Sequence, residues 1–247
     1  FFIGDDFTWF RWATKCSGSD CSVFESIFRY FAQADGFFYR PGTKVYFLLT
    51  YSIFWFNQVI YHAVSILLHF TAAALFFLIA RKILRSYFLA VLAAFLFLLL
   101  SGYSEAVFWI SSTGFLFTAV FALSSLLFFI LWEENRKIHY YVLSLITLTF
   151  GLLFHEQGVI IPFLLILYKY TKDESVSLRK LFSKFHYLFL ITPVGIYLIA
   201  RYSAQSHWFS GDYSYNLLKL PLNTVGNLLG YIFLTVLGPI SLSFYEA

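Results

Sequence analysis

The amino-acid sequence predicts an all-α protein built as a polytopic bundle of transmembrane helices. The first observation is composition, because 60% of the 247 residues are hydrophobic, only 12% are charged, and the mean hydropathy is +0.74. Soluble domains carry about 25% charged residues, so this chain must present much of its surface to lipid. The second observation is the length of the apolar runs, and the third is the alternation of basic and non-basic loops between them.

Six apolar segments are long enough to be predicted as spans, because a helix needs about 20 apolar residues to cross the hydrocarbon core. They are Gln58–Ala80, Tyr87–Tyr103, Val107–Trp132, Ile138–Phe154, Phe185–Arg201 and Leu217–Phe244. A seventh segment, Gly158–Tyr170, covers only about 20 Å at 1.5 Å per residue, which predicts a half-helix or a helix buried against its neighbours. The chain starts at Phe1, not at Met, and we expect it to be an internal piece of a longer protein.

Basic residues occupy every second connection between these segments. They are Arg81, Lys82 and Arg85 after Gln58–Ala80, Arg136 and Lys137 after Val107–Trp132, and Lys169, Lys172, Arg179, Lys180 and Lys184 at the end of Gly158–Tyr170 and between it and Phe185–Arg201. The positive-inside rule therefore predicts that these loops are cytoplasmic. We therefore expect residues 1–57 to form an extracytoplasmic segment, residues 58–247 to form the transmembrane bundle, and a further span to precede Phe1. The outer side is the exterior of a prokaryotic plasma membrane or, in a eukaryote, the lumen of the endoplasmic reticulum.

The external segment contains helix signals and both cysteines of the chain. Ser22-Val23-Phe24-Glu25 is a capping box followed by apolar residues at helical spacing, which favours an amphipathic helix lying in the membrane interface. Phe7–Thr14 is a second candidate, and two ordinary helices packed on the spans are the alternative. Cys16 and Cys21 could form a disulfide in an oxidising compartment, or remain two free thiols.

Ionisable residues near the membrane are costly and usually functional. Here they gather at the predicted outer end of the bundle: Asp5, Asp6, Arg40, His62, His69, Glu105, His155 and Glu156. Structural roles are the alternative for each, as helix caps for the acids, a headgroup contact for Arg40 and an interhelical hydrogen bond for the histidines. The carboxylates could supply a general base and a divalent-metal site, and the Arg and His side chains could bind a phosphate. A substrate with an anionic head and a long apolar tail would suit this arrangement.

The order of motifs resembles the C-type membrane glycosyltransferases, most closely the protein O-mannosyltransferase branch with the transmembrane and tetratricopeptide-repeat mannosyltransferases. The matching elements are Gly4-Asp5-Asp6, Tyr39-Arg40-Pro41, Tyr61-His62 through His69, Ser104-Glu105-Ala106-Val107 and His155-Glu156-Gln157-Gly158. The pattern departs from the family at His155, where Lys is more common, at Ser65, where Asn is common, and at Gly42, where Leu follows Arg-Pro.

The resemblance implies inverting transfer of a sugar from a polyprenyl-phosphate donor to a protein, glycan or lipid acceptor on the extracytoplasmic side. By that resemblance the acidic pair Asp5-Asp6 carries the base that deprotonates the acceptor. We expect Asp5 to be the base, Asp6 to position the acceptor or a divalent metal ion, and Glu105 to complete the catalytic group, orient the acceptor or sugar hydroxyls, or share the metal ion. Arg40, His62 and His69 bind the donor phosphate, and His155 and Glu156 orient the acceptor or the sugar. The partners are then the donor lipid, the acceptor and the bilayer, without nucleic acid.

Two other classes of function remain open from the sequence. A transporter or flippase would use Glu156 and the short Gly158–Tyr170 segment as a broken helix at its substrate site, but would be expected to show a second such segment. A membrane scaffold or an acyltransferase-like enzyme is the other alternative, and the adjacent His155-Glu156 pair does not supply the compact His-plus-acid motif of the latter.

Overall fold

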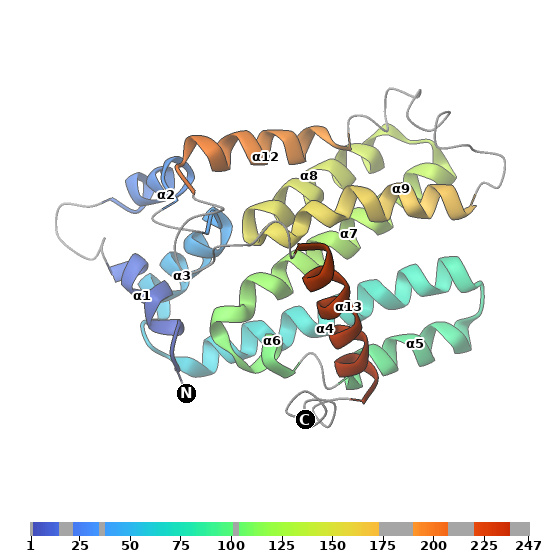
Figure 1. Ribbon diagram of the computed structural model, residues 1–247, viewed down its shortest axis with the longest axis horizontal. Coiled ribbons are helices and arrows are strands. Elements are labelled where there is room, and N and C mark those ends of the chain that lie inside the picture. The colour runs from blue at the N-terminus through green and yellow to red at the C-terminus, as the bar shows by residue number, and fades with distance from the viewer. Residues whose placement is uncertain are drawn as a thin grey trace.

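The computed structural model describes residues 2–14, 22–34, 38–100, 104–172, 190–206 and 220–237. Within these ranges every regular element is a helix and no strand occurs, which confirms the predicted all-α class (Figure 1). The elements in chain order are α1 (Asp6–Thr14), α2 (Val23–Ala32), α3 (Pro41–Phe54), α4 (Gln58–Leu84), α5 (Tyr87–Leu99), α6 (Ser104–Phe108), η2 (Ile110–Ser112), α7 (Thr113–Asn135), α8 (Ile138–Phe154), η3 (Glu156–Ile160), α9 (Ile161–Lys172), α12 (Thr192–Ser203) and α13 (Leu220–Leu237).

Two helical stretches in the described part of the chain are long and apolar enough to cross a membrane. They are α4 and the stretch Ile110–Asn135, which joins η2 to α7. Helices α5 and α8 are apolar but shorter, with 13 and 17 residues. The bounds of α8 coincide with the predicted span Ile138–Phe154, whereas parts of the last two predicted spans lie outside the described residues. The number of membrane crossings therefore stays a prediction.

The predicted span Val107–Trp132 is not one continuous helix. Helix α6 ends at Phe108, Trp109 is extended, and a short 3-10 turn precedes α7. Hydroxyl groups in this turn compete with the helical hydrogen-bond pattern, and Thr113 Oγ1 donates to the Ile110 carbonyl at 2.6 Å. The break leaves the backbone N–H of Ser111 available for a partner outside its own helix.

Helix α3 occupies part of the external segment, where the sequence analysis expected no helix. It begins at Pro41, whose fixed φ suits the first helical position and whose missing N–H costs nothing there. It ends at Phe54, and the residue that follows, Trp55, has a positive φ of 53°. Phe47, Leu48 and Tyr51 bury one face of α3, so this helix is the platform on which α1 and α2 pack.

Ion pairs define one end of the bundle. Lys82 Nζ lies 2.6 Å from Glu134 Oε2, and Lys169 Nζ lies 2.7 Å from Glu133 Oε2. These contacts join the C-terminal ends of α4, α7 and α9, which is the predicted cytoplasmic end. Helices α1, α2 and α3 lie at the opposite end (Figure 1).

Small polar residues hold α7 against α8. The hydroxyls of Ser125 and Ser144 each donate to the other residue's carbonyl at 2.9 Å, and Thr118 Oγ1 donates to the Gly151 carbonyl at 3.0 Å. Bonds of this kind and small side chains let apolar helices approach closely where no water competes. The side-by-side packing of α7 and α8 fixes where the C-terminal end of α8 lies relative to the start of α7.

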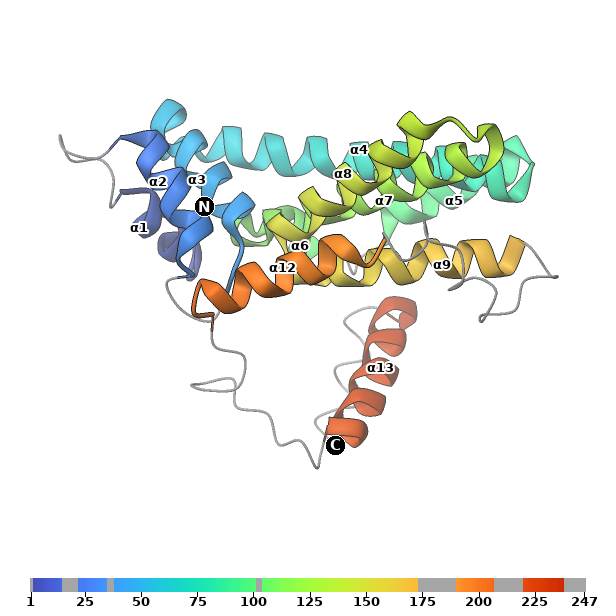
Figure 2. The same cartoon turned by 90° about the horizontal axis from the view of Figure 1, so that it is seen from above.

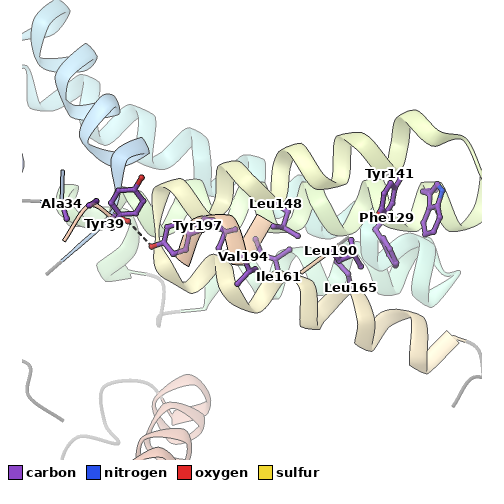
Figure 3. Close-up of a cluster of buried hydrophobic side chains, with 13 residues drawn as sticks. Ala34, Tyr39, Phe129, Tyr141, Leu148, Ile161, Leu165, Leu190, Val194 and Tyr197 are labelled. Carbon is purple, nitrogen blue, oxygen red and sulfur yellow. Dashed lines mark hydrogen bonds between the residues drawn. The ribbon is translucent and has the colours of Figure 1, made fainter. Parts of the chain in front are cut away.

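The larger buried cluster joins α7, α8, α9 and α12 with the segment before α3 (Figure 3). Leu148, Ile161 and Leu165 are fully buried within it. At one edge the Tyr197 hydroxyl donates to the Tyr39 carbonyl at 3.1 Å. Figure 2 shows α12 running alongside α8, while α13 stands apart from the other helices. The cluster therefore fixes the residues just before α3 against α12.

Helices α1 and α2 were each predicted to lie either in the membrane interface or packed against the spans, and the structure differs between the two helices. Helix α1 buries Trp9, Phe10 and Ala13 against α3 and α4, so it is a packed helix. Helix α2 turns Tyr30 inward, but the side chains of Phe24 and Phe28 are 85% and 76% exposed. An apolar face directed away from the protein is the arrangement that interfacial binding requires.

The predicted helix cap of α2 is present, since the Ser22 hydroxyl accepts the Glu25 backbone N–H at 3.1 Å. Cys16 and Cys21 lie outside the described residues, so the disulfide stays a prediction.

Candidate functional site

Three helix ends meet where α3 and α7 begin and α8 ends. Thr43 Oγ1 donates to the Phe154 carbonyl at 2.7 Å, which ties α3 to α8. The approach depends on glycine, because a Cβ atom at Gly42 would lie 3.0 Å from the Leu153 carbonyl oxygen, and one at Gly114 would lie 2.9 Å from Thr43 Oγ1. The absence of a larger residue after Arg40-Pro41 is therefore a packing requirement of this junction.

Arg40 and Glu156 form a two-point ion pair at this junction. Arg40 Nε donates to Glu156 Oε2 at 2.7 Å, and Nη2 donates to Oε1 at 2.5 Å. The Arg40 side chain is 12% exposed and that of Glu156 is 28% exposed. The ring of Phe38 covers one face of the guanidinium, with the Arg40 Cζ 4.1 Å from the ring centroid. Bidentate pairing of this kind fixes both the position and the plane of the guanidinium.

The electrostatics of the turn between α8 and α9 keep Glu156 ionised. Burial by itself would raise the pKa of Glu156, but the hydrogen bonds from Arg40 and the charges of His155 and Arg40 lower the pKa to about 2 from 4.5. The carboxylate that the sequence analysis assigned to the acceptor or sugar is therefore engaged as a fixed anion that holds Arg40.

His155 precedes Glu156 and is almost fully buried, with 3% of its surface exposed. Its Nδ1 accepts the Gln157 backbone N–H at 3.2 Å and lies 3.8 Å from Glu156 Oε2. Its ring lies against Phe115, with the ring centroids 3.9 Å apart. Burial, and to a smaller extent the charge of Arg40, lower the pKa of His155 to about 4, although Glu156 acts in the opposite direction. His155 is therefore a neutral imidazole at pH 7.

The side chains of Asp5 and Asp6, predicted to act as a pair, lie in two different environments. Asp6 is fully buried, and its carboxylate accepts hydrogen bonds from the backbone N–H of Ser111 at 2.7 Å, the Ser111 hydroxyl at 2.5 Å and the Ile3 backbone N–H at 2.9 Å. Asp5 is exposed, and within the described structure its carboxylate meets no donor. Asp6 is thus an anchor for the N-terminal segment, and Asp5 is the carboxylate that a substrate can reach.

The start of α7 links the Asp6 anchor to the Arg40–Glu156 pair. Ser111 binds Asp6, and Phe115, only four residues later, packs on His155. Four helical residues rise about 6 Å. The acidic segment and the turn between α8 and α9 therefore belong to the same end of the bundle, as the sequence predicts.

The remaining predicted residues lie around this centre. His62, on α4, is within electrostatic range of Asp6. His69 lies two helical turns further along α4, where its ring stacks on Phe97 of α5 with centroids 5.6 Å apart. Glu105 is exposed in the first turn of α6, and its side chain has no described partner. The structure thus pairs Arg40 with Glu156 and stacks His69 on Phe97.

The structure offers no support for a metal site at Asp6 and Glu105. No group of three or more His, Cys, Asp and Glu side chains suited to hold a metal ion occurs among the described residues. Asp6 already accepts three hydrogen bonds, which occupy three of the about four lone-pair positions of its carboxylate.

Two residues of α12 join the site without having been predicted. The Tyr197 hydroxyl experiences the charges of Arg201, Glu156 and Arg40 and is hydrogen-bonded to Arg201, which is itself 4% exposed. Arg201 ends a predicted span on the outer side, where the positive-inside rule disfavours a cation. The position of Arg201 at the outer end of a span could therefore have indicated a functional role from the sequence. The sequence did not indicate that Arg201 lies near Arg40, because the two residues are far apart in the chain.

The site therefore consists of an immobilised arginine, a neutral buried histidine and an accessible carboxylate at one end of a helical bundle. These groups can bind an anionic oxygen and accept a proton from a hydroxyl. Comparison with known proteins found no family model, no curated protein and no solved structure that matches the chain.

Proposed function

We propose that this chain is part of a multi-pass membrane glycosyltransferase that moves a sugar from a polyprenyl-phosphate donor to an acceptor on the extracytoplasmic face. The observation that carries the proposal is the Arg40–Glu156 pair, held at the end of the bundle that also contains Asp5 and Asp6. An enzyme acting on a lipid-linked phosphate needs a fixed cation for the phosphate and a base for the acceptor.

The geometry of Arg40 suits an anion on its remaining edge. Glu156 occupies Nε and Nη2, and Phe38 covers one face of the guanidinium. Nη1 donates to no described group, so that edge is available to a phosphoryl oxygen. Glu156 acts here as a positioning residue, because a guanidinium fixed in advance loses little entropy when a phosphate binds.

In the proposed reaction the Asp5 carboxylate takes the proton of the acceptor hydroxyl. The acceptor oxygen forms a bond to the anomeric carbon from the face opposite the leaving group, and the bond from that carbon to the phosphate oxygen breaks. The polyprenyl phosphate leaves with the electron pair, and Arg40 stabilises the negative charge that develops on it. Asp6 contributes by anchoring the segment that carries Asp5.

Transfer by the full-length protein in membranes, with radiolabelled polyprenyl-phosphate sugars, tests this proposal. We expect Arg40→Lys to reduce transfer strongly, because an ammonium cannot reproduce the two-point contact with Glu156. Arg136→Lys is the matched control, since Arg136 pairs with Glu133 at the opposite end of the bundle with an exposed side chain. Absence of transfer from every lipid-linked sugar by the wild-type protein, or equal activity of the Arg40 and Arg136 variants, would contradict the proposal.

A further inference from the structure

The side chain of His155 has one nitrogen with a partner and one without. Because Nδ1 accepts the Gln157 backbone N–H, the proton of the neutral ring resides on Nε2. Nε2 is buried and has no hydrogen-bond partner in the described structure. A buried donor left without an acceptor costs free energy, and such groups in folded proteins call for an explanation.

The neighbouring aromatic ring does not provide that acceptor. The imidazole of His155 and the ring of Phe115 are inclined by 31° with centroids 3.9 Å apart, so the two rings lie nearly face to face. An N–H bond lies in the plane of its own ring, so Nε2–H runs alongside Phe115 instead of pointing at its π-face. Glu156 is on the Nδ1 side of the imidazole, 3.8 Å from that nitrogen, and is therefore on the wrong side to accept from Nε2.

The surroundings define which ligand could accept this hydrogen bond. Arg40 binds both carboxylate oxygens of Glu156, and one of these oxygens, Oε2, lies 3.8 Å from the Nδ1 nitrogen of His155. A hydrogen-bond donor on His155 and a guanidinium bound to the adjacent Glu156 favour a ligand oxygen with negative charge over a cation. Glu156 cannot be that oxygen, since both of its carboxylate oxygens bind Arg40.

We propose that His155 binds a phosphoryl oxygen through Nε2–H, as the second donor beside Arg40. This inference rests on the proposed function, which supplies the phosphate as the headgroup of the lipid-linked substrate. It assigns the phosphate contact to His155, in place of the predicted His62 and His69. The imidazole is held for this task by its backbone contact to Gln157 and by its packing on Phe115.

Two variants separate the roles of the two ring nitrogens. His155→Asn places a carbonyl oxygen near the position of Nδ1, which preserves the acceptor for Gln157 but removes the Nε2 donor. His155→Gln places an amide N–H near the position of Nε2, which preserves the donor but removes the acceptor. We expect His155→Asn to weaken binding of farnesyl phosphate by about 10- to 100-fold, the usual effect of losing a hydrogen bond to a charged group, and His155→Gln to weaken it much less.

Binding is measured on the purified full chain in lipid nanodiscs by isothermal titration calorimetry. Farnesol and inorganic phosphate are the reference ligands, and they distinguish a lipid phosphate from an apolar tail or a free anion. Unchanged affinity of His155→Asn for farnesyl phosphate would overturn the role of His155 and leave the proposed function standing. Wild-type protein that binds farnesyl phosphate no better than farnesol would overturn both. Inorganic phosphate bound as tightly as farnesyl phosphate would overturn the lipid source of the phosphate.

A measurement on the wild-type chain avoids dependence on how the variants fold. With ¹⁵N-labelled histidine, the Nε2–H proton resonance of His155 should move downfield when farnesyl phosphate is added, because a hydrogen bond to an oxyanion deshields the proton. Farnesol should leave the resonance in place. An Nε2–H signal that does not respond to saturating farnesyl phosphate would rule out the proposed contact.

Discussion

Arg40 and Glu156 meet in a two-point hydrogen bond although 116 residues separate them in the chain. The pair ties the start of α3 to the turn between α8 and α9, next to a junction at which glycine permits three helix ends to touch. Because Glu156 is committed to this contact, its charge stabilises the fold and orients Arg40 at the same time. The following predictions separate these two effects.

Loss of the Glu156 charge should destabilise the fold in a pH-dependent way. The pKa of Glu156 is lowered from 4.5 to about 2, so the ion pair contributes stability above about pH 4.5 that is lost as the pH falls toward 2. The whole shift corresponds to about 3 kcal/mol, and the ion pair with Arg40 supplies only part of it at pH 7, because the charge of His155 also lowers the pKa of Glu156 and His155 is neutral at that pH. Glu156→Gln should therefore lower the free energy of unfolding at pH 7 by up to this amount, and by much less near pH 3. Urea unfolding of the full chain in mixed micelles measures both values.

The matched control is Glu134→Gln. Glu134 pairs with Lys82 on the surface of the opposite end, and exposed pairs contribute at most about 1 kcal/mol. A pH dependence of the same size in both variants would show that the effect does not come from the Arg40–Glu156 contact.

Asp5 and Asp6 should respond to the same substitution in opposite ways. Asp5→Asn should leave the melting temperature unchanged and reduce transfer by about 10²- to 10⁴-fold, because an amide keeps the shape but cannot take a proton. Asp6→Asn should destabilise the chain by about 1–3 kcal/mol, because the amide N–H₂ would face a donor from Ser111 or Ile3. Thermal unfolding and a transfer assay on both variants decide the assignment. Near-normal transfer by Asp5→Asn would eliminate Asp5 as the base.

Glycine in the turn between α8 and α9 should not tolerate alanine. A Cβ atom at Gly158 would lie 2.8 Å from the Leu152 backbone nitrogen, so Gly158→Ala should lower the melting temperature. Gly195→Ala in α12 is the control, because a Cβ atom there meets nothing within 4 Å and alanine favours a helix by about 1 kcal/mol. We expect the control to be neutral or stabilising. Equal melting temperatures of wild type and Gly158→Ala would refute the close approach of these backbones.

The orientation of the bundle can be tested with single cysteines in a background lacking Cys16 and Cys21. Ser104 and Lys137 are both exposed, and the charge alternation predicts that they lie on opposite sides of the membrane. In intact cells or sealed right-side-out vesicles, an impermeant thiol reagent on the outer side should label Ser104→Cys and not Lys137→Cys. The reverse pattern would move the proposed chemistry to the cytoplasmic face.

The sequence by itself determined the features that depend on local order. Apolar runs set the helices, and the predicted bounds of α8 agree with the structure. The Ser22 cap is present as predicted, since a cap involves residues only three apart. Helix α3 was missed because its polar first turn, Pro41 to Lys44, is buried through contacts with distant segments, such as Thr43 with Phe154 and Lys44 with the Ala34 carbonyl.

Only the tertiary structure decided which polar groups act on one another. The sequence gathered Asp5, Asp6, Arg40 and Glu156 at one end of the bundle, because topology follows from span lengths and loop charges. It could not reveal that Glu156 binds Arg40, that Asp6 is buried under Ser111 or that one nitrogen of His155 lacks a partner. The physical reason is range: helix periodicity acts over a few residues, whereas a buried charge is stabilised by whichever group the packing of distant helices brings within about 3 Å.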